Sequence, residues 1–171
     1  GLPPIVAHGS AALQERIVPD VLAGRKIAAL AITEPGAGSD VARTACRARR
    51  DGDAWIVDGE KTFITSGVRA DWLTVAVRTG GQGAAGISLL AIPGDAPGLE
   101  RTPLAKMGWW CSDTARLGFA NCRVPADHLL RKIDAVLDLS KLRSQLAPHY
   151  SHTGRPSIDP ELMIRILLIG Y

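Results

Sequence analysis

The sequence has few cysteines and no long apolar run. The three cysteines, Cys46, Cys111 and Cys122, show no C-x-x-C spacing, and their odd number leaves at least one unpaired. No signal peptide stands at the start, so these features predict a reduced, cytoplasmic setting. No apolar run approaches the ~20 residues of a membrane span. The longest, residues 162–169, is interrupted by Arg165, and no membrane partner is expected.

The excess of one sign of charge over the other is also small. Lys and Arg number 20 and Asp and Glu number 17, a formal charge of +3. An excess this small and scattered does not by itself indicate a nucleic-acid-binding protein. Hydrophobic residues make up 46% of the 171 residues and charged residues 22%, the balance of a folded domain with a sizeable core. The length fits one domain, or one domain plus a fragment.

Between residues 28 and 124 the pattern is of short strands separated by Gly and Pro. Apolar and β-branched runs predict strands over residues 27–32, 54–59, 61–65, 72–77, 86–92, 116–119 and 122–124, and the second of these runs into a turn at Asp58-Gly59. The fourth and fifth of these form a predicted hairpin. Many short strands at close spacing predict an antiparallel β-barrel or sandwich.

Helical patterns flank this β-region on both sides. Before it, Ser10 is a plausible N-cap for a helix reaching residue 22, which Pro19 kinks or ends. After it, Asp127 caps a run with apolar residues at helical spacing up to Leu137, and another helix is predicted over residues 162–169. The predicted fold class is therefore mainly β, flanked by an N-terminal helical remnant and a C-terminal helical tail.

The strongest motif is Thr-Glu-Pro-Gly-Ala-Gly-Ser-Asp at residues 33–40, directly after a predicted strand. Its two glycines let backbone amides approach a ligand closely, and the hydroxyls of Thr33 and Ser39 suit an anionic or carbonyl-rich group. For a motif of only four or five such residues, a tight β-turn with polar residues and no ligand would be the favoured alternative. Two later segments follow in order: Lys-Thr-Phe-Ile-Thr-Ser-Gly at residues 61–67, and Met107-Gly108 with Cys-Ser-Asp-Thr at residues 111–114.

In this order, the three segments resemble the middle β-domain of the acyl-CoA dehydrogenases, over about residues 10–131. The resemblance implies α,β-dehydrogenation of an acyl-CoA thioester with FAD, and an assembly of identical subunits. It places Thr33 at the pyrimidine end of the flavin, Ser39 near the pyrophosphate and the acyl-CoA, Phe63 against the isoalloxazine and Thr65 near the reactive nitrogen. The implied cofactor-binding residues are Leu30, Ala31, Ile32, Thr33, Gly38, Ser39, Phe63, Ile64 and Thr65, and Ser39 is also the implied substrate-binding residue.

The family's catalytic glutamate has no counterpart in this sequence. In the family it lies in or just before a C-terminal helical domain. Glu34 belongs to the turn motif, whereas Glu60 and Glu100 are expected to be solvated. General-base catalysis requires a carboxylate within hydrogen-bond reach of the proton, so no catalytic residue is assigned. We expect a truncated dehydrogenase, inactive alone, whose FAD binding is weak or absent.

Other patterns favour structural roles. Residues 81–86 satisfy G-x-G-x-x-G, but a strand follows where a dinucleotide site needs a helix, so a hairpin loop is expected. His149 and His152 lack the companions of a metal site, and no metal is expected. Trp109-Trp110 indicates either a partly exposed surface or, more commonly, the edge of a core. Phe63 taken alone is equally consistent with a core aromatic.

From about residue 124 to the end, the sequence resembles the N-terminal part of insertion-sequence transposases of the DDE class, above all in Thr-Gly-Arg-Pro-Ser-Ile-Asp-Pro-Glu-Leu-Met at residues 153–163. Residues 124–130 fit both families, so the junction is placed within 124–131. The chain is divided into a helical remnant (1–27), a flavin-binding β-domain (28–126) and a transposase-like segment (127–171). Two alternatives remain beside the dehydrogenase: a DNA-binding transposase fragment, with DNA a partner only if the tail acts, and a non-functional fusion product.

Overall fold

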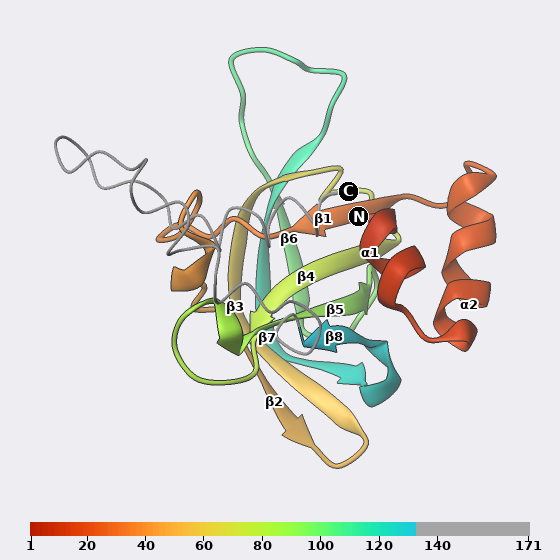
Figure 1. The fold of residues 1–171 in the computed structure, drawn as a ribbon. Helices are drawn as coiled ribbons and strands as arrows, with labels where there is room; N and C mark the ends of the chain where they lie inside the picture. The colour runs from red at the N-terminus through yellow and green to blue at the C-terminus, as the bar shows by residue number, and fades with distance from the viewer. Residues whose placement is uncertain (133–171) are drawn as a thin grey trace, which may run out of the picture.

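The computed structural model describes residues 1–132, which form two helices followed by one sheet (Figure 1). The helices are α1 (Leu2–His8) and α2 (Ala11–Leu22), and three short 3-10 turns are η1 (Val41–Arg43), η2 (Ala84–Gly86) and η3 (Ala126–His128). The strands are β1 (Ala28–Ala31), β2 (Arg47–Asp51), β3 (Ala54–Thr65), β4 (Trp72–Arg78), β5 (Ile87–Pro93), β6 (Leu99–Pro103), β7 (Thr114–Pro125) and β8 (Leu129–Lys132).

The eight strands form one open sheet in the order β6-β7-β3-β2-β4-β5-β8, with β1 beside β4. The predicted mainly-β class is confirmed. Of the two predicted forms, barrel or sandwich, the barrel is wrong because the end strands β6 and β8 do not pair. The purely antiparallel arrangement is also wrong. β1 runs parallel to β4, and β2 meets β4 in parallel through the single pair Arg47–Arg78. The ladder of the sheet is therefore narrowest between β2 and β4.

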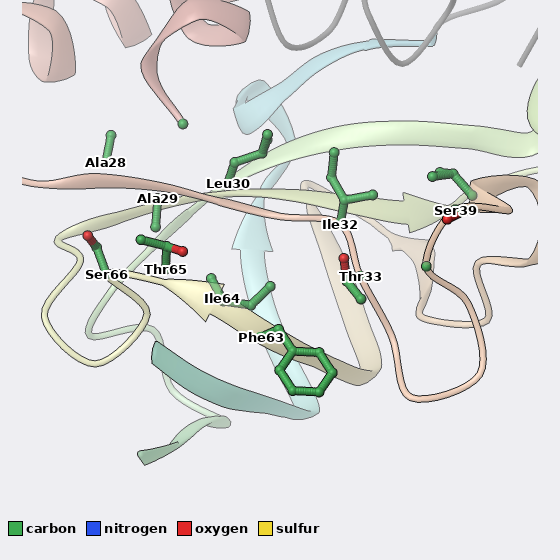
Figure 2. Close-up of a pocket in the computed structure, with 13 residues that line it drawn as sticks. Ala28, Ala29, Leu30, Ile32, Thr33, Ser39, Phe63, Ile64, Thr65 and Ser66 are labelled. Atoms are coloured by element: carbon green, nitrogen blue, oxygen red, sulfur yellow. The ribbon is translucent and has the colours of Figure 1, made fainter. Parts of the chain in front are cut away.

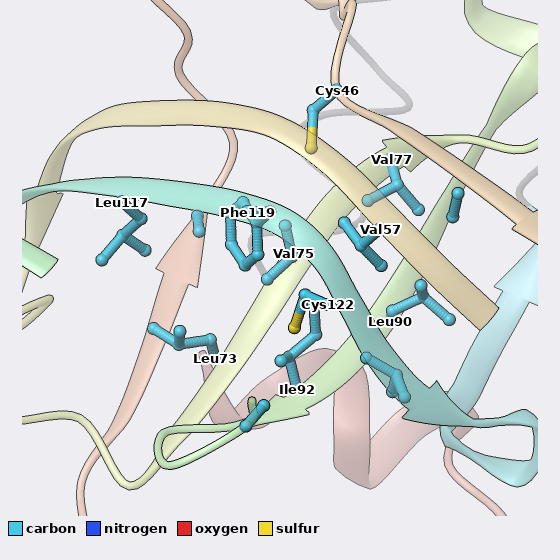
Figure 3. Packing of buried hydrophobic residues seen from close by; sticks show 14 of the residues in the cluster. Cys46, Val57, Leu73, Val75, Val77, Leu90, Ile92, Leu117, Phe119 and Cys122 are labelled. Carbon is cyan, nitrogen blue, oxygen red and sulfur yellow. The ribbon is translucent and has the colours of Figure 1, made fainter. Parts of the chain in front are cut away.

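Two apolar clusters cover the two faces of the β4–β5 hairpin, whose residues are almost all buried. One face packs against β3 and β7 in the main core, as Figure 3 shows for Val57, Val75 and Phe119. The other face packs against the helices, where Ile5, Leu13 and Ile17 are at most 1% exposed. A strand buried on both faces is apolar throughout and does not alternate, which matches the sequence of β4 and β5.

The predicted hairpin of β4 and β5 is confirmed, with Trp72 opposite Pro93 and Arg78 opposite Ile87. The loop over residues 81–86 joins these strands, as expected of a G-x-G-x-x-G string followed by a strand. The predicted cap of α2 is also confirmed, because the Ser10 side chain accepts a hydrogen bond from the Leu13 amide at 3.3 Å. Pro19 lies inside α2 without ending it.

Two predicted strand breaks are wrong. β3 runs unbroken through Asp58-Gly59, and β7 runs unbroken through residues 120–121. Gly59 has a φ of 135°, and a Cβ there would lie 2.7 Å from the Cα of Cys46. A glycine is therefore needed here because two backbone segments approach closely inside the sheet. In the sequence, such a glycine looks the same as one that marks a turn. Sequence analysis also missed α1, β2 and β6.

The helix predicted from Asp127 is wrong over its first residues. Residues 126–128 form a 3-10 turn, and Leu129–Lys132 form β8 beside β5. Leu129 packs on the main core, whereas Leu130 packs on the helix-facing cluster, which is the alternation of a strand. Pairing with the free edge of β5 outweighs the local helical spacing. The remainder of that predicted helix, the helix over 162–169, His149 and His152 lie outside the described residues.

Helix α2 is joined to the sheet through a buried histidine. The Arg16 guanidinium donates to Nε2 of His128, while Nδ1 of His128 donates to the Ala91 carbonyl at 2.9 Å. The same guanidinium lies 5.3 Å from the ring centroid of Trp72. Nε2 can accept from Arg16 only when the imidazole is neutral. Burial lowers the pKa of His128, and the positive charge of Arg16 lowers it further.

This arrangement predicts that the chain loses stability as the pH falls from 7 to 5. The folded pKa of His128 lies below the ordinary value of 6.5, so the unfolded chain takes up the proton first. The stabilisation is present above pH 6.5 and decreases as the pH falls towards the folded pKa, by at most ~1.4 kcal/mol per pH unit. Urea unfolding at several pH values measures the slope. In His128→Asn, which cannot titrate, the slope should become shallower, and an unchanged slope would contradict this assignment.

Candidate functional site

A cavity of about 580 Å³ lies between β1 with its following loop and the end of β3 (Figure 2). Its volume is that of an ordinary small-molecule or cofactor site. All the cofactor-binding residues expected from the sequence line it except Ala31, so the structure brings the two motifs together. Its lining residues are Gly1, Ala28, Ala29, Leu30, Ile32, Thr33, Gly38, Ser39, Val41, Phe63, Ile64, Thr65 and Ser66.

Apolar side chains from β1 and from the residue that follows it line the cavity. Leu30 and Ile32 are partly exposed and line it, and between them Ala31 is fully buried in the main core. Successive side chains of a strand point to opposite faces, so Ala31 belongs to the opposite set. Leu30 and Ile32 make one wall of the cavity apolar.

Phe63 is held outside the core by a β-bulge. Along β3, Lys61 is opposite Leu117 and Ile64 is opposite Ala115, so β3 carries one more residue than β7 in this interval. Phe63 has a φ of 58° and is 70% exposed, whereas Ile64 is 2% exposed. The alternative of a core aromatic is therefore wrong. A left-handed φ is unfavourable for a bulky side chain, and an aromatic ring exposed at such a position is suited to contact a ligand.

The motif at residues 33–40 forms a closed turn whose glycines face open space. Glu34 and Ala37 exchange both backbone hydrogen bonds, at 2.7 and 3.2 Å. A Cβ built at Gly36 would meet nothing within 4 Å, and one at Gly38 only the methyl group of Thr33 at 3.9 Å. Neither glycine has a positive φ. Unlike Gly59, these two glycines are not required by the packing or by the backbone of the chain.

A buried ion pair beneath the cavity was missed by sequence analysis. Nζ of Lys61 lies 2.8 Å from Oε1 of Glu34 and 2.9 Å from the Ile32 carbonyl oxygen. The side chains of Lys61 and Glu34 are 0% and 5% exposed. Burial lowers the pKa of Lys61, and the neighbouring Cys46 and Glu34 oppose this change. The available signal was that Lys61 is the one charged residue of its motif, and that the motif at residues 33–40 carries acidic residues of opposite charge, Glu34 and Asp40.

No lining residue of the cavity, within the part of the chain that the structure describes, carries a carboxylate. Glu34 is engaged by Lys61. Glu60 pairs with Arg116 at the surface of the sheet, and Glu100 is exposed. Over residues 1–132 no three His, Cys, Asp or Glu side chains gather into a cation site, and neither helix is long and apolar enough to span a membrane.

The tryptophan pair is a surface feature. Trp109 and Trp110, in the loop between β6 and β7, are 78% and 77% exposed, and Met107 beside them is fully exposed. Placement at the edge of a core is therefore wrong, and the alternative of an exposed surface is confirmed.

The family model for the middle domain of acyl-CoA dehydrogenases matches residues 29–122, more than half of the chain. The chain belongs to the acyl-CoA dehydrogenase family. A second model, described as a transposase domain, matches residues 119–171 and overlaps the first over residues 119–122. Both resemblances seen in the sequence are thereby confirmed.

Among its relatives, the chain is 44% identical over 133 residues to the acyl-CoA dehydrogenase apdG of Emericella nidulans, covering 76% of this chain and 30% of that protein. A probable acyl-CoA dehydrogenase from Mycobacterium abscessus is 45% identical with a TM-score of 0.75, over 99% of this chain and 51% of that one. A glutaryl-coenzyme A dehydrogenase in complex with glutaryl-CoA is 34% identical with a TM-score of 0.74, over 76% and 33%. The chain thus spans about a third of the length of the curated relatives it matches.

Proposed function

We propose that the cavity between β1 and β3 binds the flavin of FAD, and that the chain provides the cofactor surface for α,β-dehydrogenation of an acyl-CoA thioester. The observation that carries this proposal is Phe63, an aromatic ring exposed at a φ of 58° on the wall of the cavity. The family membership supports the same cofactor and the same class of substrate.

The lining of the cavity fits a flavin. Leu30 and Ile32 provide an apolar wall that excludes water from a ring system, and Phe63 provides an aromatic face. Thr33 and Thr65 also line the cavity, and their hydroxyls would hydrogen-bond ring heteroatoms. When bound, a flavin accepts the electrons removed from the acyl chain, and the protein contributes orientation and exclusion of water.

The phosphate-bearing part of the ligand is assigned to Gly38 and Ser39. The space above Gly38 admits a close approach to the backbone, and the hydroxyl of Ser39 adds a donor for phosphate or for the acyl-CoA. No residue of this chain is assigned as the base that removes the α-proton, because the cavity wall has no carboxylate over the described residues. We further propose that FAD binding by this chain is weak and that, as the resemblance implies, it acts in an assembly of identical subunits.

Replacing Phe63 by asparagine tests this assignment. Asparagine tolerates a left-handed φ and removes an exposed aromatic ring, so the free energy of unfolding should stay the same or rise by ~1 kcal/mol. The dissociation constant for FAD should rise about tenfold, because stacking against the ring is lost. FAD titration followed by flavin fluorescence, together with urea unfolding, measures both quantities. Unchanged FAD affinity in Phe63→Asn would remove Phe63 from the site, and absence of FAD binding by the parent chain would overturn the proposed function.

A further inference from the structure

The buried Lys61–Glu34 pair connects segments on both sides of the proposed flavin site. Nζ of Lys61 donates to the Ile32 carbonyl as well as to Glu34. The backbone between these two contacts is also bound to β3, because the Thr62 amide donates to the Thr33 carbonyl at 2.8 Å. Three consecutive residues, 32–34, are therefore held against the same point of β3.

Glu34 joins a third segment to this point. Its Oε2 accepts a hydrogen bond from the Ala45 amide at 2.7 Å, and its Oε1 accepts one from the Cys46 amide at 3.0 Å. These amides lie just before β2, at the far end of the loop that carries Ser39. The carboxylate thus accepts from two backbone amides and one ammonium group, which satisfies a buried charge that would otherwise be costly.

Each residue of the Lys61–Glu34 pair lies close in the chain to residues of the proposed flavin site. Lys61 is the last residue in register before the bulge that turns Phe63 outwards. Glu34 directly follows Thr33 and begins the turn closed by Ala37. One buried contact, the Lys61–Glu34 pair, therefore sets the distance between Phe63 on one wall of the cavity and the turn that begins at Thr33 on the other. The pair itself does not reach the cavity.

We propose that Lys61 and Glu34 are positioning residues, which hold the turn at residues 33–39 against the Phe63 bulge and thereby set the affinity for flavin. The inference rests on the proposed function for its ligand. The pair acts through Thr33 and Phe63 and is assigned no contact with the cofactor.

The test uses the full 171-residue chain with the double variant Lys61→Met/Glu34→Gln, which removes both charges together and leaves none unpaired. Two quantities are measured: amide hydrogen exchange at Ala37 and Thr62 without added flavin, and the FAD dissociation constant. We expect exchange at both amides to become at least tenfold faster and the dissociation constant to rise at least tenfold. The milder Glu34→Asp, which keeps both charges of the pair but shortens the reach of the carboxylate, is measured beside it and should give smaller changes in the same direction.

The matched control is Arg116→Met/Glu60→Gln. It removes an ion pair that joins β3 to β7, at the exposed surface and away from the turn. We expect it to leave exchange at Ala37 and Thr62, and FAD affinity, within a factor of two of the parent chain.

The outcomes separate this inference from the proposed function. Faster exchange at both amides with weaker FAD binding supports it. Unchanged exchange, or faster exchange with unchanged FAD affinity, overturns it and leaves the proposed function standing. If the parent chain binds no FAD, the proposed function fails, and exchange at the two amides alone decides whether the pair positions the turn. If the double variant does not fold, Glu34→Asp gives the same decision.

Discussion

Replacing Gly38 by leucine should weaken FAD binding about a hundredfold, or ~2.7 kcal/mol, without destabilising the chain. The space into which the new side chain would grow contains no protein atom closer than the Thr33 methyl group, 3.9 Å from the Cβ position. The backbone at Gly38 is not in the left-handed region, so a side chain brings no strain there. The free energy of unfolding should therefore change by less than ~0.5 kcal/mol. The packing and the backbone of the chain do not require this glycine, whereas a ligand that approaches its backbone does.

Gly36→Leu is the matched control for this variant. Gly36 lies in the same turn, is exposed, and also has nothing within 4 Å of its Cβ position, but it does not line the cavity. FAD titration and urea unfolding of both variants separate a steric block from a general disturbance of the turn. Equal loss of FAD affinity in the two variants would argue against Gly38 as a contact residue, and unchanged affinity in Gly38→Leu would place the ligand elsewhere.

Replacing Lys61 alone by methionine should cost about 3–5 kcal/mol of unfolding free energy. The change leaves the Glu34 carboxylate, 5% exposed, without its counter-ion and leaves the Ile32 carbonyl without its donor. Adding Glu34→Gln should recover more than half of this loss, because the uncompensated charge disappears with the second substitution. The thermodynamic cycle of parent, two single variants and double variant should give a coupling energy of ~2 kcal/mol or more.

Urea unfolding at pH 7 followed by tryptophan fluorescence provides these free energies, since Trp55 and Trp72 are both buried in the sheet. The surface pair of Glu60 and Arg116 provides the comparison. Its side chains are 38% and 57% exposed, so its cycle should give less than ~1 kcal/mol. Additive effects of Lys61→Met and Glu34→Gln would show that the two side chains do not stabilise one another.

Local sequence was sufficient where a residue's role depends on its own neighbours in the chain. The Ser10 cap and the β4–β5 hairpin were predicted because capping chemistry and continuous apolar runs are local. The residues of the two motifs that line the cavity were named by family resemblance, and the fold brings them together. Their role toward flavin remains a prediction.

Local sequence was insufficient where a distant segment completes the environment. Asp58-Gly59 has the composition of a turn, yet both residues lie within β3. The missing side chain of Gly59 leaves room for Cys46 to pack against the backbone of that strand. Leu129 and Leu130 belong to a run of apolar residues at helical spacing, yet they form a strand because this segment pairs with the edge of β5. In both cases the deciding contact comes from a segment many residues away, and no local pattern contains it.

By itself, the sequence determined the family, the mainly-β class and the two motifs around the cavity, because these depend on residue types in a fixed order. Only the tertiary structure decided that the sheet is open, that Ala31 faces the core and that Phe63 faces outwards. It also showed that Lys61 and Glu34, 27 residues apart, meet in the interior. The physical reason is that strand pairing, a one-residue bulge and a buried charge pair are contacts between segments, and each is set by what lies opposite.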